Sequence, residues 1–221
     1  MTAPALSVRL TSVEVPGPAG ALEALLQEHA GVGHPIAALV LHPHPLHGGT
    51  FHNKVVHRAA STLVQFGAAV LRINFRGVGH SAGSFDRGRG ELEDARAAWR
   101  WLAARHPESR LWLAGFSFGS WVAARLAASE PNCERVILVA PPVGTQDFSV
   151  MKHSAVPKLV LQGTADSVCP PALLDEQYAG WAEPRQLQRV EGASHFFDRK
   201  LAEFGHALRE GLAGVVTEAN R

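Results

Sequence analysis

The chain has 221 residues, of which 46% are hydrophobic and 19% are charged, and its formal net charge is +1. This composition is typical of a folded globular protein and excludes a disordered chain. The near-neutral charge gives no electrostatic reason to bind nucleic acid or an anionic membrane.

The N-terminal part of the sequence predicts a β-hairpin. Apolar and polar residues alternate from Ser7 to Val15, which is typical of a half-buried strand, and Pro16 to Gly20 predict a turn. The composition of Ala21 to His29 favours a helix, but the preceding turn and the glycines at 31 and 33 suit a second hairpin strand. We therefore predict two antiparallel strands at the start of the chain.

From residue 36 onward, short apolar runs alternate with longer amphipathic stretches. The predicted strands are Ile36–His42, Ala68–Phe75, Leu111–Ala114, Arg135–Ala140, Lys158–Gln162 and Gln186–Val190. The predicted helices are Asn53–Phe66, Glu91–Arg105, Trp121–Ala128, Pro171–Trp181 and Arg199–Val216, and Arg76–Gly90 is a predicted glycine-rich loop. This alternation indicates one α/β domain over residues 1–221, with a mostly parallel sheet and helices on both faces. In such sheets reactive groups gather at the carboxyl ends of the strands.

A G-x-S-x-G motif, Gly115 to Gly119, lies between a predicted strand and the following helix. A nucleophilic serine at such a position needs a very tight turn, and glycines two residues away on either side leave room for it. The motif alone is a weak signal, because a glycine-rich turn with an exposed serine would look the same. Its place between strand and helix makes Ser117 a candidate nucleophile.

A serine nucleophile needs a base, and the base needs an orienting carboxylate. Asp166 follows the predicted strand that ends at Gln162, and His195 follows the one that ends at Val190. Each could instead be an ordinary loop residue, with Asp166 in an Asx-turn. The order serine, acid, histidine, each just past a strand, favours a catalytic triad of Ser117, Asp166 and His195.

Together these features resemble the α/β-hydrolase superfamily over nearly the whole chain, and most closely a compact bacterial branch of predicted hydrolases. The closer likeness is carried by the segments His42–Thr50, Asn53–Val56 and Asn74–Ser81. The resemblance implies an α/β-hydrolase fold with antiparallel N-terminal strands and a lid between the strands at Arg135–Ala140 and Lys158–Gln162. Only Pro141 to Pro157 are available there, which is too short for a cap domain.

The resemblance also implies an oxyanion hole built from two backbone N–H groups. By position, His44 matches the histidine of the usual His-Gly pair, Pro45 matches the glycine, and Leu46 supplies the first N–H. Pro45 departs from the family pattern, so the identity of this donor stays open. The second donor is the N–H of Phe118.

The histidine, cysteine and glycine patterns predict neither a metal nor a cofactor. Four histidines gather at positions 42, 44, 47 and 52, but no carboxylate or cysteine accompanies them. Cys133 and Cys169 lie outside any C-x-x-C spacing, and Cys169 lacks the turn that a nucleophile needs. There is no early G-x-G-x-x-G motif for a dinucleotide.

We therefore expect a serine hydrolase that cleaves carboxylic esters or thioesters of a small acyl substrate. An amidase or peptidase on the same fold and a non-catalytic binding protein are the alternatives. Met1 to Val15 lack the apolar core of a signal peptide, and no apolar run is long enough to span a bilayer. We expect a cytoplasmic protein without membrane or nucleic-acid partners, and a homodimer is compatible with the sequence.

Overall fold

The computed structural model describes residues 7–219, and the side chains of residues 7–213. The strands are β1 (Val8–Gly17), β2 (Gly20–His29), β3 (Ile36–Leu41), β4 (Ala68–Ile73), β5 (Arg110–Phe116), β6 (Cys133–Val139), β7 (Lys158–Gly163) and β8 (Arg185–Val190). The α-helices are α1 (Lys54–Gln65), α2 (Arg89–Arg105), α3 (Phe118–Ala127), α4 (Pro171–Tyr178) and α5 (Leu201–Ala219). Two short 3-10 helices are Pro45–His47 and Ser149–Lys152. Residues 1–6 and 220–221, which belong to the predicted domain, lie outside the described residues.

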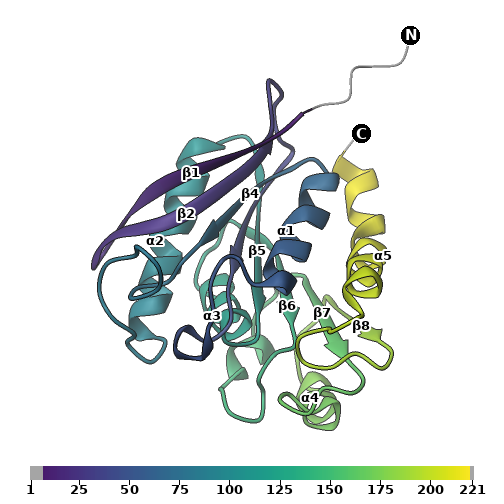
Figure 1. The fold of residues 1–221 in the computed structure, drawn as a ribbon. Coiled ribbons are helices and arrows are strands. Elements are labelled where there is room, and N and C mark those ends of the chain that lie inside the picture. Colours follow the sequence, from purple (N-terminus) through teal and green to yellow (C-terminus); the bar gives the residue numbers. More distant parts are fainter. Residues whose placement is uncertain (1–6, 220–221) are drawn as a thin grey trace.

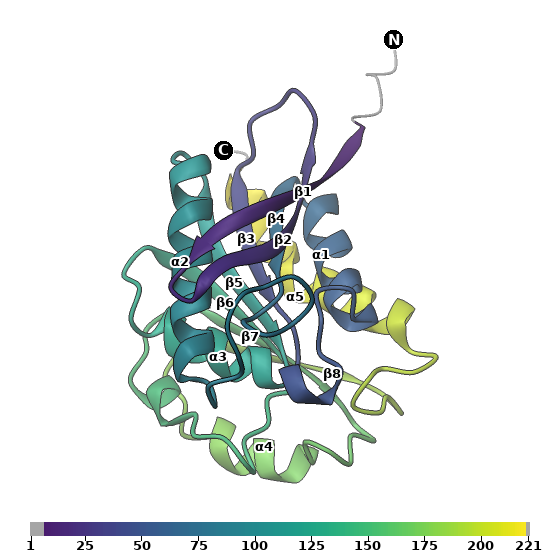
Figure 2. The ribbon, with the colours of Figure 1, turned by 60° about the vertical axis from the view of Figure 1, so that its left-hand side comes forward.

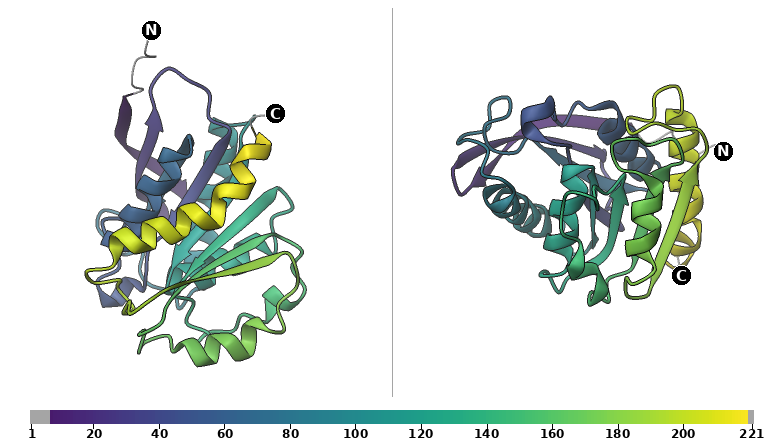
Figure 3. Two further views of the ribbon diagram at one scale, coloured as in Figure 1. Left: turned by 90° about the vertical axis from the view of Figure 1, so that its right-hand side faces the viewer. Right: turned by 90° about the horizontal axis from the view of Figure 1, so that it is seen from below.

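All eight strands form one sheet in the order β1-β2-β4-β3-β5-β6-β7-β8. β1 pairs antiparallel with β2, and β2 pairs antiparallel with β4, whereas the pairs from β4 to β8 are parallel. Helices α1 and α5 cover one face of this sheet, and α2 and α3 cover the other (Figures 1 and 3). The predicted α/β-hydrolase fold is confirmed, including the antiparallel start that is visible in Figure 2.

The central strands are apolar on both sides because both faces of the sheet are covered. Strand β3 is buried at every position, and successive side chains enter two different cores. Ile36, Ala38 and Val40 contact the α1 and α5 side, whereas Ala37, Leu39 and Leu41 contact the α2 and α3 side. The parallel strands are thus fixed in place, and their carboxyl ends form one edge, here called the carboxyl edge.

Several predicted boundaries shift by a few residues. Strand β1 continues to Gly17, which shortens the predicted turn, and Pro16 is tolerated because β1 is an edge strand. Helix α2 begins at Arg89 rather than Glu91, inside the predicted loop. Helix α3 begins at Phe118, three residues before the predicted Trp121, so strand, serine and helix follow one another without a loop.

The segment between β6 and β7 forms no cap domain. It carries only the short helix at Ser149–Lys152, whose Met151 is fully buried. The Trp121 indole N–H donates to the Asp147 carbonyl at 3.0 Å, which ties this segment to α3. No helix within residues 7–219 is both long and apolar enough to cross a membrane.

Candidate active site

Ser117 occupies a strained turn between β5 and α3. Its φ of 53° lies in the left-handed region, which is unfavourable for a residue with a side chain. Its N–H donates to the Val139 carbonyl of β6 at 2.8 Å, so the neighbouring strand holds the turn. A Cβ at Gly115 would lie 2.1 Å from the Gly119 carbonyl, and one at Gly119 would lie 2.5 Å from the carbonyl oxygens of Leu41 and His42, at the end of β3. Both glycines are therefore required by close backbone contacts.

The three residues of the predicted triad lie in one hydrogen-bonded line. Ser117 Oγ is 3.1 Å from His195 Nε2, and His195 Nδ1 is 2.9 Å from Asp166 Oδ2. They come from the loops after β5, β7 and β8, which meet at the carboxyl edge. Because Asp166 accepts the proton on Nδ1, Nε2 carries the lone pair that can accept the serine proton.

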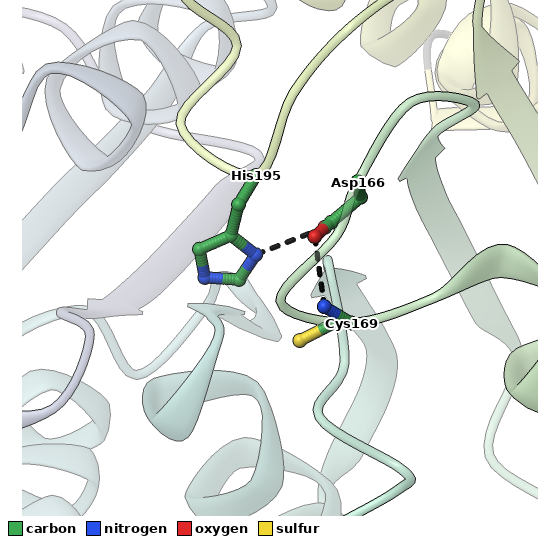
Figure 4. A group of neighbouring side chains, drawn as sticks. All are labelled: Asp166, Cys169 and His195. Carbon is green, nitrogen blue, oxygen red and sulfur yellow. Dashed lines mark hydrogen bonds and ion pairs between the residues drawn. The ribbon is translucent and has the colours of Figure 1, made fainter.

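Asp166 is buried, and four donors hold its carboxylate, of which Figure 4 shows His195 and Cys169. The N–H groups of Val168 and Cys169 donate to Oδ1 at 2.9 and 2.8 Å. Gln162 Nε2 donates to Oδ2 at 3.2 Å and to the Cys169 carbonyl at 2.8 Å. Together with His195 these bonds compensate the burial of a negative charge.

Gln162 is a supporting residue that the sequence analysis missed. Its side chain is fully buried at the end of β7, where it reaches both Asp166 and the loop that follows. The available signal was a single amide directly after the three apolar residues of the strand, four residues before the acid. A buried amide needs hydrogen-bond partners, so its position could have indicated a polar network at this strand end.

The two backbone N–H groups expected to bind an oxyanion, those of Phe118 and Leu46, differ in whether they already donate a hydrogen bond. Phe118 is the first residue of α3, and an N–H at this helix position has no partner within the helix. The N–H of Leu46 lies in the helix Pro45–His47 and donates to His44 Nδ1 at 3.2 Å. The His44 ring also contacts Phe118, with 5.1 Å between ring centroids, so the two segments are neighbours.

The histidine cluster near residue 42 has structural roles. His42 is fully buried, accepts the Phe75 N–H on Nε2 at 3.0 Å and donates from Nδ1 to the Pro43 carbonyl at 2.6 Å. Burial lowers the pKa of His42 to about 4, so the ring is neutral at physiological pH. His44 and His47 stack on each other at 4.4 Å.

Within the described part of the chain, the side chains spaced closely enough to hold a metal ion are Asp166, Cys169 and His195 instead. Burial raises the pKa of the Cys133 and Cys169 thiols to about 12, so both are neutral and unsuited to nucleophilic attack.

The loop that follows β4 is anchored by buried polar contacts. Arg76 forms a two-pronged ion pair with Asp94 of α2, at 2.9 and 2.8 Å. Asn74 accepts the Phe51 N–H at 2.9 Å and donates to Glu23 at 2.8 Å. These contacts tie the segment after β4 to α2 and to β2, which gives it a structural role.

Exposed apolar side chains gather on the loops of the carboxyl edge. Leu46, Val168 and Phe196, on the loops after β3, β7 and β8, are exposed by 68%, 60% and 43%. Phe196 follows His195 directly, and their rings lie 5.1 Å apart. Solvent-facing apolar groups next to a half-buried serine provide a surface suited to an apolar ligand.

Comparison with known proteins identifies close relatives. Residues 34–155 match the family described as serine aminopeptidase, S33. An uncharacterised protein of Rickettsia prowazekii is 40% identical over 209 residues, 90% of this chain and 87% of the relative. A lidless α/β serine hydrolase of Xanthomonas campestris is 39% identical with a TM-score of 0.86, covering 96% of this chain and 97% of that one. An α/β serine hydrolase homologue of Coxiella burnetii is 38% identical with a TM-score of 0.87, covering 91% and 97%.

Proposed function

The chain belongs to the serine aminopeptidase S33 family of α/β serine hydrolases, and from this premise we propose that it cleaves carboxylic ester or thioester bonds of a small substrate. The observation that carries the proposal is the line of hydrogen bonds from Ser117 through His195 to Asp166. This line joins a nucleophile, a base and an orienting acid in the geometry that acyl transfer requires.

In the proposed acylation step, Ser117 Oγ attacks the substrate carbonyl while its proton moves to His195 Nε2. The imidazolium that forms is stabilised by the Asp166 carboxylate, which accepts four hydrogen bonds. His195 then gives the proton to the leaving oxygen or sulfur atom, and the acyl group remains on Ser117. Water releases it in the second step, again with His195 as the base.

The negative charge that develops on the carbonyl oxygen needs two donors close to Ser117. Phe118 supplies a free N–H at the start of α3, where the helix dipole also favours negative charge. Leu46 supplies the second if its N–H exchanges the nitrogen of His44 for the oxyanion. One such donor stabilises the transition state by about 3–4 kcal/mol. This gain exceeds the stabilisation lost when the hydrogen bond between Leu46 and His44 breaks.

The surroundings of Ser117 favour an apolar acyl group over a charged amine. An aminopeptidase must bind the ammonium group of its substrate, usually with a carboxylate. The exposed side chains on these loops include Leu46, Val168 and Phe196, whereas Asp198 is paired with Lys54. A peptidase is therefore the second candidate, supported by the description of the matched family.

The test combines covalent labelling with kinetics. A fluorophosphonate probe should label the wild-type chain at Ser117, and Ser117→Ala should lose both the label and at least about 10⁴-fold of kcat/KM on p-nitrophenyl butyrate. Ser129→Ala is the matched control, because Ser129 lies just past the far end of α3 and should leave both readouts unchanged.

Each alternative has its own outcome in this experiment. Full activity in Ser117→Ala would refute the proposal, and an unlabelled wild-type chain would favour a binding protein. Faster cleavage of aminoacyl p-nitroanilides than of esters would select the peptidase. The cytoplasmic location and the homodimer expected from the sequence stay predictions, and light scattering tests the second.

A further inference from the structure

Three buried side chains with different donor atoms meet behind the proposed catalytic serine. A carboxylate oxygen of Asp166, the sulfur of Cys169 and a ring nitrogen of His195 lie within 4.8 Å of one another. Figure 4 shows the imidazole and the thiol beside the same carboxylate, from the loops after β8 and β7. The proposed mechanism uses the acid and the imidazole, and it leaves the thiol without a role.

We propose that Asp166, Cys169 and His195 form a binding site for a thiophilic divalent cation such as Zn²⁺, and that the bound cation switches the enzyme off. The inhibitory effect rests on the proposed function, whereas the binding site itself does not. Such a site is regulatory and differs from a resident metal cofactor.

The donor set suits zinc. One thiolate, one imidazole and one carboxylate are the ligand types that zinc prefers, with bonds of about 2.0–2.3 Å. Ligand atoms around a tetrahedral zinc ion therefore lie about 3.5 Å apart. The nitrogen and oxygen are now 2.9 Å apart and the group spans at most 4.8 Å, so small side-chain movements suffice.

The outer contacts also fit a metal site. The N–H groups of Val168 and Cys169 fix the carboxylate through Oδ1, so Oδ2 faces the imidazole. Carboxylate ligands in metal sites are oriented by outer hydrogen bonds of this kind. Next to this carboxylate, Gln162 Oε1 is buried and has no hydrogen-bond partner among the described residues, which leaves one unused oxygen acceptor beside the site.

Metal binding at Nδ1 would disable the base while Ser117 stays in place. The cation takes the position of the Nδ1 proton between His195 and Asp166. The displaced proton moves to Nε2, so the imidazole ring stays neutral. The Cys169 thiol loses its proton to solvent, so thiolate and carboxylate together neutralise the two positive charges. With a proton on Nε2, His195 can no longer accept the proton of Ser117.

The experiment measures binding and inhibition separately. Co²⁺ added to the wild-type protein should produce the near-ultraviolet charge-transfer band of a cobalt–thiolate bond with one ion per chain. Zn²⁺ should abolish ester hydrolysis, and a chelator should restore it. Each variant's inhibition is compared with its own metal-free rate, so a change in the basal rate does not affect the result.

The two cysteines offer a matched pair of variants. Cys169→Ala should lose the cobalt band and raise the half-inhibiting zinc concentration by at least about 100-fold, because loss of even an outer contact weakens metal sites by about 10–100-fold. Cys133→Ala removes an equally buried thiol on β6 and should keep both responses. Cys169→Ser serves if the alanine variant does not fold.

The proposal is overturned if wild-type protein gives no cobalt–thiolate band, or if the band survives in the Cys169 variants. Inhibition by zinc that is equal in wild type and Cys169→Ala also overturns it, because the cation then binds elsewhere. A Cys169-dependent band in a protein that no fluorophosphonate labels would support the metal site and refute the proposed hydrolase instead.

Discussion

At the scale of single residues, the backbone of Ser117 shows how the site is constrained. A non-glycine residue at positive φ costs about 1–3 kcal/mol, and the surrounding contacts must hold it there. The hydrogen bond to Val139 and the two flanking glycines do so, because each glycine allows the backbone of another segment to approach.

Gly119→Ala should therefore damage the turn. The new Cβ would meet the Leu41 and His42 carbonyls at 2.5 Å, and overpacking of this kind destabilises by about 1–3 kcal/mol. We expect the Gly119→Ala variant to unfold at a lower urea concentration than the wild type and to react more slowly with a fluorophosphonate at Ser117. Gly33→Ala is the control, because its Cβ would meet nothing within 4 Å. Equal stability of the two variants would show that the close contact at Gly119 does not determine the stability of the turn.

The residues of the proposed triad could be predicted from the sequence, because a local motif and the order along the chain point to them. The residues that support them could not. Gln162 contacts Asp166 only because the loop after β7 turns back over the strand end. His42 was weighed only as one of a histidine cluster for which no metal was predicted, whereas its partner is the N–H of Phe75, which only the pairing of β3 with β4 brings near.

At the scale of elements, His42 joins the ends of the neighbouring strands β3 and β4 through its hydrogen bond with the Phe75 N–H. Its pKa of about 4 in the folded protein lies below the ordinary value of 6.5, because burial disfavours the charged ring. The unfolded chain therefore binds a proton at higher pH than the folded chain. The stabilisation is complete above about pH 6.5 and is lost as the pH falls toward about pH 4.

We expect His42 alone to cost the wild-type protein about 2 kcal/mol of unfolding free energy between about pH 7.5 and about pH 5. Urea unfolding at both pH values measures this loss. His42→Gln should show a loss smaller by about that amount, whereas His206→Gln, on the exposed part of α5, retains the buried ring and should match the wild type. Identical losses in all three proteins would contradict the pKa of His42.

Element types were more predictable than element boundaries. The hairpin, the alternating strands and the helices follow from apolar periodicity and turn residues. The sequence placed Trp121–Ala128 in a helix after the motif without fixing its first residue, and α3 begins at Phe118. The helix begins there because the strained serine turns the chain directly from β5 into α3, a tertiary constraint that local rules do not contain.

At the scale of the whole molecule, the fold leaves the carboxyl edge without a cap domain. The segment between β6 and β7, where the resemblance implied a lid, is folded back through Met151 and Asp147. Its short length could be read from the sequence, whereas its packing against α3 depends on contacts far apart in the chain.

Kinetics should reflect this open site. The rate of hydrolysis of p-nitrophenyl esters should saturate smoothly as the substrate concentration crosses its solubility limit, because no lid must open at an interface. Stopped assays across a series of concentrations measure this. A sharp rise in rate at the point where aggregates form would contradict an uncovered site.

Ser117 and His195 differ in how firmly the sheet holds them. The serine follows β5, which has neighbours on both sides, whereas the histidine follows β8, the edge strand opposite β1, which pairs with β7 alone among the described strands. Local unfolding starts at edge strands of this kind. On heating or in denaturant, the loop that holds the proposed base His195 would thus unfold while Ser117 keeps its place, so activity would be lost before the protein unfolds globally.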